Sequence, residues 1–205
     1  MTSASERSGA PALFIDRDGT LIADAHYLAD AARVRVLDGA AAAVAKANAA
    51  QVPVVVVTNQ SGIARGLITI EQYEAVRDQT NALLMAGDAT VLATYHCPHW
   101  GHPNEPCACR KPGLGMYRDA AAAYQLDLGH SAYIGDRWRD VQPALATGGI
   151  GILVPGIETP AADVEDARSA LSGRIFMAEN ILEAVSIALA MIGPRAPLQT
   201  SSETE

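Results

Sequence analysis

Short apolar runs alternate along the chain with longer segments that have helical patterns. The apolar runs predict strands at 12–16, 53–58, 90–96, 132–136, 151–155 and 174–178. The helical segments are 38–51, 69–87, 114–126, 138–148 and 181–193, and Pro143 interrupts the fourth within its first turns. Thr69 is the expected N-cap of the second helix, and Gly87 its end.

Strands that alternate with helices are typical of a parallel sheet covered by helices on both faces. The run 53–58 is apolar and β-branched almost throughout, as expected for a strand buried on both sides. We therefore expect an α/β fold with a single domain over residues 11–193. The small, polar segments 1–10 and 194–205 are expected to be flexible tails.

The composition narrows the classes of protein that fit this fold. Of 205 residues, 49% are apolar and 19% charged, which suffices for a core and excludes global disorder. The net charge of −8 argues against binding nucleic acid by bulk charge. No apolar run reaches the roughly 18–20 residues that span a bilayer, and no secretory signal is visible. We expect a cytoplasmic protein with no membrane partner.

Polar residues follow three of the predicted strands, in the segments 16–20, 58–62 and 135–140. Ligands of open parallel sheets bind beyond the carboxyl ends of the strands, so these segments are where the chemistry is expected. The four carboxylates in them belong to Asp16, Asp18, Asp136 and Asp140. If strand geometry continues past the first strand, its two acids lean to the same side.

Four carboxylates cannot converge unless a cation is bound or some of them are protonated. Mg²⁺ prefers oxygen ligands and typically combines one or two carboxylates with water and a phosphate. A carboxylate beside such a metal can attack phosphorus, and a second can protonate the leaving group and then activate water. The alternative is that these acids cap turns and complement a helix dipole.

Three further residues are suited to holding a phosphorylated ligand. Thr58 and the backbone N–H groups of the loop after it can bind phosphate oxygens, although the same residues are common in ordinary turns. Lys111 and Lys46 are the only lysines beside thirteen arginines, and a compact ammonium suits a crowded site. Arg110 can bind a second phosphate or sugar hydroxyls. A solvated lysine is the alternative for Lys111.

The three cysteines, Cys97, Cys107 and Cys109, lie within thirteen residues. Their odd number argues against a disulfide framework, and their clustering favours a metal. With one nearby histidine they form a Cys₃His set that can close a tetrahedral Zn²⁺ site, which is structural because no position stays open. The competing histidines are His96, His99 and His102. Buried free thiols are the alternative.

Together these segments resemble the haloacid dehalogenase superfamily of phosphohydrolases, in which DxD, a threonine, a lysine and GDxxxD follow in this order. The resemblance implies a Rossmann-like three-layer sandwich with a central parallel sheet. It implies that Asp16 is the nucleophile and Asp18 the general acid and base, and that Thr58 and Lys111 hold the phosphate.

The same resemblance implies a magnesium site formed by Asp16, Asp136 and the main-chain carbonyl of Asp18. Asp140 takes the second acidic position of the last motif, where it can orient Lys111 or a metal-bound water.

The stretches FIDRDGTL, VVVTNQSGIARG, CPH, CxCRKP and GMYRDA are similar to D-glycero-D-manno-heptose 1,7-bisphosphate phosphatases and, less fully, to the histidinol-phosphatase domain. The similarity covers about residues 12–155 and favours His99 as the fourth zinc ligand. It implies removal of the C7 phosphate, with histidinol phosphate or another small metabolite as the alternative substrate. Ile22 departs from the heptose pattern, which often has asparagine there.

Many relatives cover the site with a cap domain, but the segments 20–38 and 62–109 leave no room for one. Loops alone are therefore expected to cover it. Arg65 and Arg110 are predicted to bind a second anionic group of the substrate, as a sugar bisphosphate requires, and Asn59 and Gln60 to bind the substrate too. Arg137 and Arg139 are interpreted as surface charges, and a monomer is expected.

Two further hypotheses remain, one from another class of protein and one with another substrate. A zinc-stabilised binding module would keep the fold without turnover, although every catalytic position is filled. A DNA 3′-phosphatase would use similar motifs, but the acidic charge and the lack of a basic, aromatic-lined groove argue against it.

Overall fold

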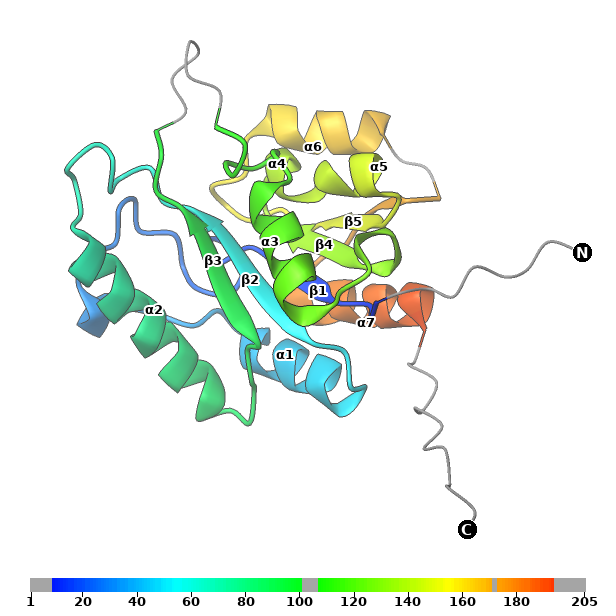
Figure 1. Ribbon diagram of the computed structural model, residues 1–205, viewed down its shortest axis with the longest axis horizontal. Helices are drawn as coiled ribbons and strands as arrows, with labels where there is room; N and C mark the ends of the chain where they lie inside the picture. Colours follow the sequence, from blue (N-terminus) through cyan, green and yellow to red (C-terminus); the bar gives the residue numbers. More distant parts are fainter. Residues whose placement is uncertain (1–8, 101–106, 171–172, 194–205) are drawn as a thin grey trace, which may run out of the picture.

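The computed structural model describes residues 9–100, 107–170 and 173–193. Six strands form one all-parallel sheet in the order β3-β2-β1-β4-β5-β6. Their bounds are β1 (Leu13–Ile15), β2 (Val54–Asn59), β3 (Ala93–Cys97), β4 (Ala132–Gly135), β5 (Ile150–Leu153) and β6 (Ile175–Met177). The strand order reverses at β1, which lies between β2 and β4 and places their carboxyl ends side by side (Figure 1).

Alternate residues of the central strands point to opposite faces of the sheet. Leu13 and Ile15 of β1 pack into one hydrophobic cluster, and Phe14 between them packs into another. β2 divides in the same way, with Val54 and Val56 on the first face. Because both faces are covered, the strands are apolar at every position rather than at every second one.

The helices form the two outer layers of a three-layer α/β sandwich (Figure 1). On the face of Leu13 lie α1 (Ala40–Ala49), α2 (Ile70–Met85) and α7 (Ile181–Ile192), and α1 and α7 pack against each other. The opposite face carries α3 (Gly115–Tyr124), α4 (Trp138–Val141), α5 (Pro143–Thr147) and α6 (Ala161–Ser169). The described part of the chain also has 3₁₀ turns η1 (Ala31–Arg33) and η2 (Leu128–His130).

The expected strands and most helices are confirmed, with three differences. The third strand begins at Ala93 rather than at residue 90. The expected helix 138–148 is two helices, because Pro143 has no N–H to donate and occupies the first position of α5. The helix α6 was not predicted, since Ala167 is its only fully buried residue and it has no apolar stripe.

The N-cap of α2 is Thr69, as predicted. Its side chain and that of Gln72 bond each other's backbone N–H in a capping box, which satisfies donors at the start of the helix. Gly87 follows the C-cap Ala86 rather than capping the helix itself.

The described residues all belong to the sheet, its helices and their connecting loops, so this part of the chain contains no separate cap domain. Within it, no helix is long and apolar enough to cross a membrane. The predicted tails fall almost entirely outside the described residues, in 1–8 and 194–205.

Candidate active site

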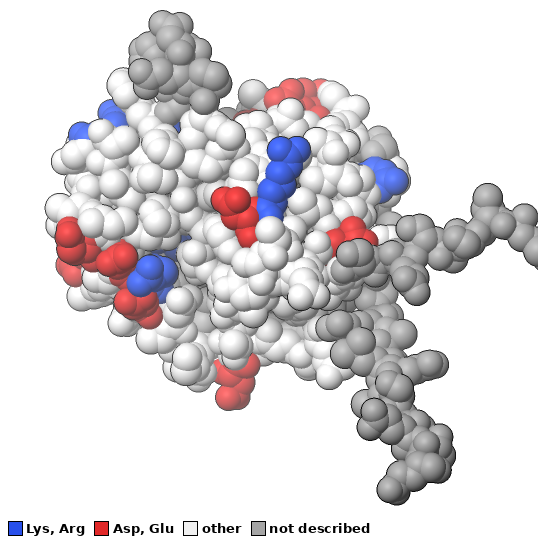
Figure 2. Space-filling view, viewed as in Figure 1, with Lys and Arg blue, Asp and Glu red and all other residues white. Residues whose placement is uncertain are grey.

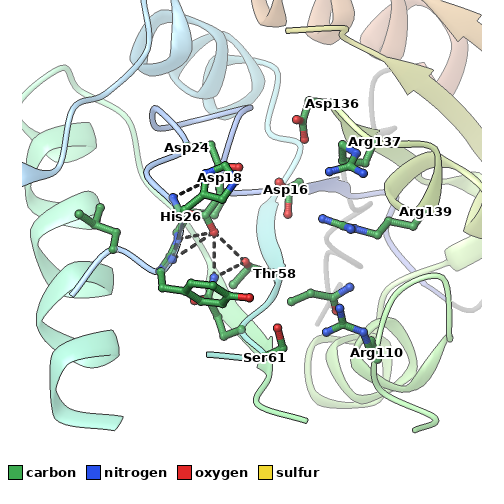
Figure 3. A pocket seen from close by; sticks show the side chains of 15 residues that line it. Asp16, Asp18, Asp24, His26, Thr58, Ser61, Arg110, Asp136, Arg137 and Arg139 are labelled. Carbon is green, nitrogen blue, oxygen red and sulfur yellow. Dashed lines mark hydrogen bonds and ion pairs between the residues drawn. The ribbon is translucent and has the colours of Figure 1, made fainter. Parts of the chain in front are cut away.

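The carboxyl ends of β1, β2 and β4 open into a cavity of about 250 Å³ (Figure 3). Asp16 follows β1, Thr58 and Asn59 end β2, and Asp136 follows β4, and all four residues line the cavity. The backbone N–H of Asp16 donates to Ile134 of β4, so the first acid continues the sheet by one residue. The three predicted segments therefore meet at one cavity, whose small volume suits a small metabolite.

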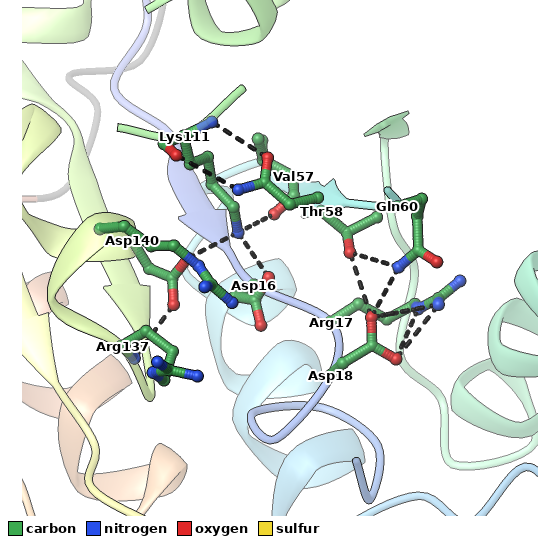
Figure 4. Close-up of polar contacts among 11 residues, drawn as sticks. Asp16, Arg17, Asp18, Val57, Thr58, Gln60, Lys111, Arg137 and Asp140 are labelled. Carbon is green, nitrogen blue, oxygen red and sulfur yellow. Dashed lines mark hydrogen bonds and ion pairs between the residues drawn. The ribbon is translucent and has the colours of Figure 1, made fainter. Parts of the chain in front are cut away.

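Lys111 lies behind Asp16 at the floor of this site; only 1% of its side chain is exposed, and it is not itself among the residues that line the cavity (Figure 4). Its Nζ is 2.5 Å from Asp16 Oδ1, 2.8 Å from Asp140 Oδ1 and 2.6 Å from the carbonyl oxygen of Val57. Burial alone would lower the pKa of Lys111, but the carboxylates of Asp140 and Asp16 raise it. The lysine is therefore held as a cation between Asp16, which follows β1, and Asp140, which lies in α4.

A second lobe of the site surrounds Asp18. Its Oδ2 accepts hydrogen bonds from Thr58 Oγ1 at 3.1 Å and from Gln60 Nε2 at 2.8 Å, and its carboxylate forms an ion pair with Arg17 at 3.1 Å. Arg17 is itself buried and lies over the ring of Tyr73. Asp16 and Asp18 consequently contact different sets of partners, which the simple strand geometry did not indicate (Figure 4).

Asp16, Asp136 and Asp140 form a cluster of buried acids suited to a cation. One carboxylate oxygen from each lies within 4.8 Å of the others. Burial, with the neighbouring carboxylates, raises the pKa of Asp136 to about 8. Burial also raises the pKa of Asp16 to about 7, although Lys111 opposes the shift. Within the described part of the chain, Asp136 Oδ1 is buried without a hydrogen-bond partner.

A divalent cation would supply a partner for the buried Asp136 Oδ1. It would also favour the ionised form of the clustered carboxylates, whose pKa values burial raises. Gly19 keeps this place open: a Cβ there would lie 2.5 Å from Asp136 Oδ2, and its φ of +85° favours glycine. The donor set and the burial therefore fit Mg²⁺.

Asn59 joins the end of β2 to the loop that carries the lysine. Its amide nitrogen donates to the carbonyl of Lys111 at 3.2 Å, and its amide oxygen accepts from the N–H of Lys111 at 3.0 Å. Asn59 therefore has two places in the site: it lines the cavity, and its amide group bonds the backbone of Lys111.

Of the two arginines predicted to bind a second anionic group, one lines the cavity and the other does not. Arg110 lines the cavity and donates to the carbonyl of His99 at 3.3 Å. Arg65 is not among the lining residues, because its guanidinium lies 5.3 Å from the ring centroids of both Tyr27 and Trp100 and donates to the Tyr27 hydroxyl. It therefore supports the rim through Tyr27, which does line the cavity.

Sequence reasoning missed several lining residues, notably Arg137, Arg139, Asp24 and His26. The two arginines were interpreted as surface charges, yet both lie within four residues of the end of β4, at the carboxyl edge of the sheet. Their position after a predicted strand could have indicated that these arginines lie near the ligand.

The three cysteines and His99 converge beside the site. The distances among the three Sγ atoms and His99 Nδ1 range from 3.1 to 3.6 Å. Four such donors around one point suit a tetrahedral Zn²⁺ ion with no open position, as predicted. His96 instead packs its ring on Tyr73 at 4.2 Å, and His102 lies outside the described residues.

Two family models match the chain. The one described as polynucleotide kinase 3 phosphatase matches residues 12–143, and the one described as HAD-hydrolase-like matches residues 108–184.

Two curated relatives are named as heptose bisphosphate phosphatases. The probable D-glycero-D-manno-heptose-1,7-bisphosphate 7-phosphatase of Thermoplasma acidophilum is 37% identical over 134 residues, which are 65% of this chain and 82% of that protein. The D-glycero-beta-D-manno-heptose-1,7-bisphosphate 7-phosphatase of Escherichia coli strain K12 is 36% identical over 152 residues, which are 70% of this chain and 78% of that protein.

Among solved structures, the D,D-heptose 1,7-bisphosphate phosphatase of B. bronchiseptica, complexed with magnesium and phosphate, superposes with a TM-score of 0.75. It is 32% identical, and the match covers 88% of this chain and 98% of that one.

Proposed function

Because the chain belongs to the haloacid dehalogenase family of hydrolases, we propose that it is a Mg²⁺-dependent phosphatase that removes the C7 phosphate of D-glycero-D-manno-heptose 1,7-bisphosphate. The observation that carries the proposal is the buried Asp16–Lys111–Asp140 arrangement beside Asp136, at the floor of a cavity the size of a small ligand.

In the proposed first step, a carboxylate oxygen of Asp16 attacks phosphorus. A bond from phosphorus to Asp16 forms while the bond from phosphorus to the C7 oxygen breaks. Asp18 donates its proton to that oxygen as the alcohol leaves. The bonds from Thr58 and Gln60 hold the Asp18 carboxyl at the end of the strand, separate from the nucleophile.

In the second step, Asp18 accepts a proton from water, whose oxygen attacks phosphorus and releases inorganic phosphate and free Asp16. Lys111 neutralises charge on Asp16 and on the transferred phosphoryl group, and Asp140 keeps Lys111 in place. Asp16, Asp136 and the main-chain carbonyl of Asp18 would hold Mg²⁺, which supplies charge neutralisation at the phosphate oxygens.

A metabolite rather than a nucleic acid is the proposed substrate. Figure 2 shows basic and acidic side chains in small separate groups on the face it displays, with no broad basic surface there. The net charge of −8 would oppose a polyanion, so attraction of a phosphorylated ligand depends on the local arginines. We also propose that residues 11–193 act as one domain and that the protein is a monomer.

The test is phosphate release with Mg²⁺ from both anomers of the heptose bisphosphate, compared with histidinol phosphate and a 3′-phosphorylated oligonucleotide. The proposal expects a preference for the bisphosphate of about 100-fold or more in kcat/KM. Asp16→Asn, checked for folding, should abolish the activity. A preference for histidinol phosphate or for the oligonucleotide would replace the proposed substrate while leaving the proposed mechanism.

A further inference from the structure

Three of the arginines that line the active-site cavity lie on one of its walls. Figure 3 shows Arg110, Arg137 and Arg139 on one side, and the acidic residues Asp18 and Asp24 on the other. Under the proposed function, a bisphosphate brings a second anionic group that is not hydrolysed. That group is attracted to the arginine wall, whereas on the opposite wall Arg17 already pairs with Asp18.

Arg137 is already engaged by a neighbouring helix. Its Nε is 2.6 Å from Asp163 Oδ2 in α6, and the same carboxylate oxygen accepts from the N–H of Trp138 at 3.2 Å. This pair fastens the start of α4 to α6, so Arg137 has a structural partner before any ligand binds.

Arg139 is the arginine of this wall with the loosest protein contact. Its nearest ion-pair partner is Asp140 Oδ1 at 3.9 Å, which is too long for a hydrogen bond. Asp140 itself is engaged by Lys111 and by the N–H of Arg137. Among the described residues Arg139 Nε is buried without a hydrogen-bond partner, although 41% of the side chain is exposed.

A buried guanidinium donor without a partner is costly, and a phosphate oxygen is the acceptor that suits it best. Arg139 lies on the first turn of α4, and Figure 3 shows its side chain reaching into the cavity toward the acids. Arg110 reaches the same wall from the loop that precedes Lys111.

We propose that Arg139, together with Arg110, binds the second phosphate group of the substrate, the one that is not hydrolysed. This inference rests on the proposed function. Arg139 is thereby a specificity-determining residue that selects bisphosphorylated over monophosphorylated sugars. The sugar then lies across the cavity with its hydroxyl groups toward Asp24, which would repel a phosphate placed there.

The experiment compares kcat/KM for the heptose 1,7-bisphosphate and for the heptose 7-phosphate in the wild type and in Arg139→Gln. The ratio of the two values should fall by about 10- to 100-fold, as expected for the loss of a charged hydrogen bond, mainly through KM for the bisphosphate. Arg139→Lys should have a ratio between those of the wild type and Arg139→Gln, because lysine keeps the positive charge but lacks the planar set of N–H donors of a guanidinium. Arg168→Gln, an exposed position on α6, is the matched control and should leave the ratio unchanged.

An unchanged ratio in Arg139→Gln would overturn the inference. Equal losses for both substrates would also overturn it, because Arg139 would then act through Asp140 and Lys111 rather than on the second phosphate. If the wild type hydrolyses neither heptose phosphate, the proposed substrate is wrong, and the role of Arg139 is tested in another way. Inhibition of p-nitrophenyl phosphate hydrolysis by mannose 1-phosphate then tests the subsite, and an inhibition constant unaltered by Arg139→Gln would refute it.

Discussion

Lys111 and Asp140 form an ion pair of 2.8 Å, with only 1% and 2% of their side chains exposed. The two residues come from the loop after the cysteine segment and from the first turn of α4. A charge pair buried to this degree is destabilising when either partner is lost, because the remaining charge has no compensation.

Replacing Lys111 by methionine should therefore lower both stability and activity. The expected loss is about 3–5 kcal/mol in the free energy of unfolding, measured by urea denaturation, since Asp16 and Asp140 would be left facing each other. Lys46→Met is the matched control, because Lys46 is exposed and, among the described residues, bonds only the Ser186 hydroxyl, so its loss should change stability by no more than about 0.5 kcal/mol.

Asp140→Asn retains the size of the side chain and tests the same pair if Lys111→Met does not fold. Its kcat for an aryl phosphate should fall while the protein still folds. Wild-type stability in Lys111→Met, together with wild-type kcat in Asp140→Asn, would contradict the importance of this pair.

The hydroxyl of Thr58 is predicted to act through Asp18. Thr58→Val removes a hydrogen bond to that carboxylate without changing the shape of the side chain, and should lower kcat about 10- to 100-fold, as for a lost bond to a charged group. Thr58→Ser keeps the hydroxyl and should recover most of the activity. Steady-state kinetics with an aryl phosphate measures both variants.

Thr80→Val provides the control for this change, because the Thr80 hydroxyl is also buried but bonds only the carbonyl of Val76 inside α2. It should leave kcat unchanged. Equal kcat values for Thr58→Val and Thr58→Ser would mean that the position requires only the shape of the side chain.

The strand-end part of the site could be predicted because topology alone determines it. Parallel strands end at the same edge, so the acids that follow β1 and β4 and the threonine that ends β2 must be neighbours. The sheet itself was recognisable because strands buried on both faces are apolar at every position, as β2 is.

Long side chains on loops were harder to assign, because their partners come from other loops. Arg65 carries the same charge as Arg139, yet it lies against the rings of Tyr27 and Trp100, which are 38 and 35 positions away along the chain. Arg139 faces the cavity because of where α4 starts. The position of neither side chain follows from residue type or spacing, since both positions depend on the paths of several loops.

Magnesium should stabilise the protein more strongly as the pH rises. Without a divalent cation, burial raises the pKa of Asp16 to about 7 and of Asp136 to about 8. The ordinary value is about 4, so between about pH 4 and 8 the folded chain binds more protons than the unfolded chain. Its free energy of unfolding therefore falls as the pH rises through this range. Mg²⁺ binds the ionised carboxylates and opposes that loss.

Thermal unfolding in buffers with and without Mg²⁺, at about pH 6 and about pH 8.5 on either side of those pKa values, measures the effect. The rise in Tm that Mg²⁺ causes should be larger at the higher pH, and Asp136→Asn should reduce it at both. A rise that is equal at the two pH values would show that Mg²⁺ binding is not linked to these acids. Omitting Mg²⁺ rather than adding a chelator leaves the cysteine–histidine cluster undisturbed.

The cysteine–histidine cluster is predicted to hold Zn²⁺ that positions Lys111. Cys109 precedes Lys111 by two residues, and the backbone N–H of Gln60 donates to the carbonyl of Cys97 at 2.8 Å, so the cluster is joined to both halves of the site. His99→Gln removes one of four ligands and should reduce the bound zinc from about one ion per chain, with a lower Tm and a lower kcat.

His96→Gln is the matched control, because His96 lies on the same segment but packs on Tyr73 instead of joining the cluster. It should retain zinc, as measured by metal analysis of the purified protein. Loss of zinc in His96→Gln but not in His99→Gln would show that His96, rather than His99, is the fourth zinc ligand. Loss of zinc in His99→Gln with unchanged kcat would show that Asn59, which bonds the backbone of Lys111 on both sides, suffices to hold the lysine without the metal.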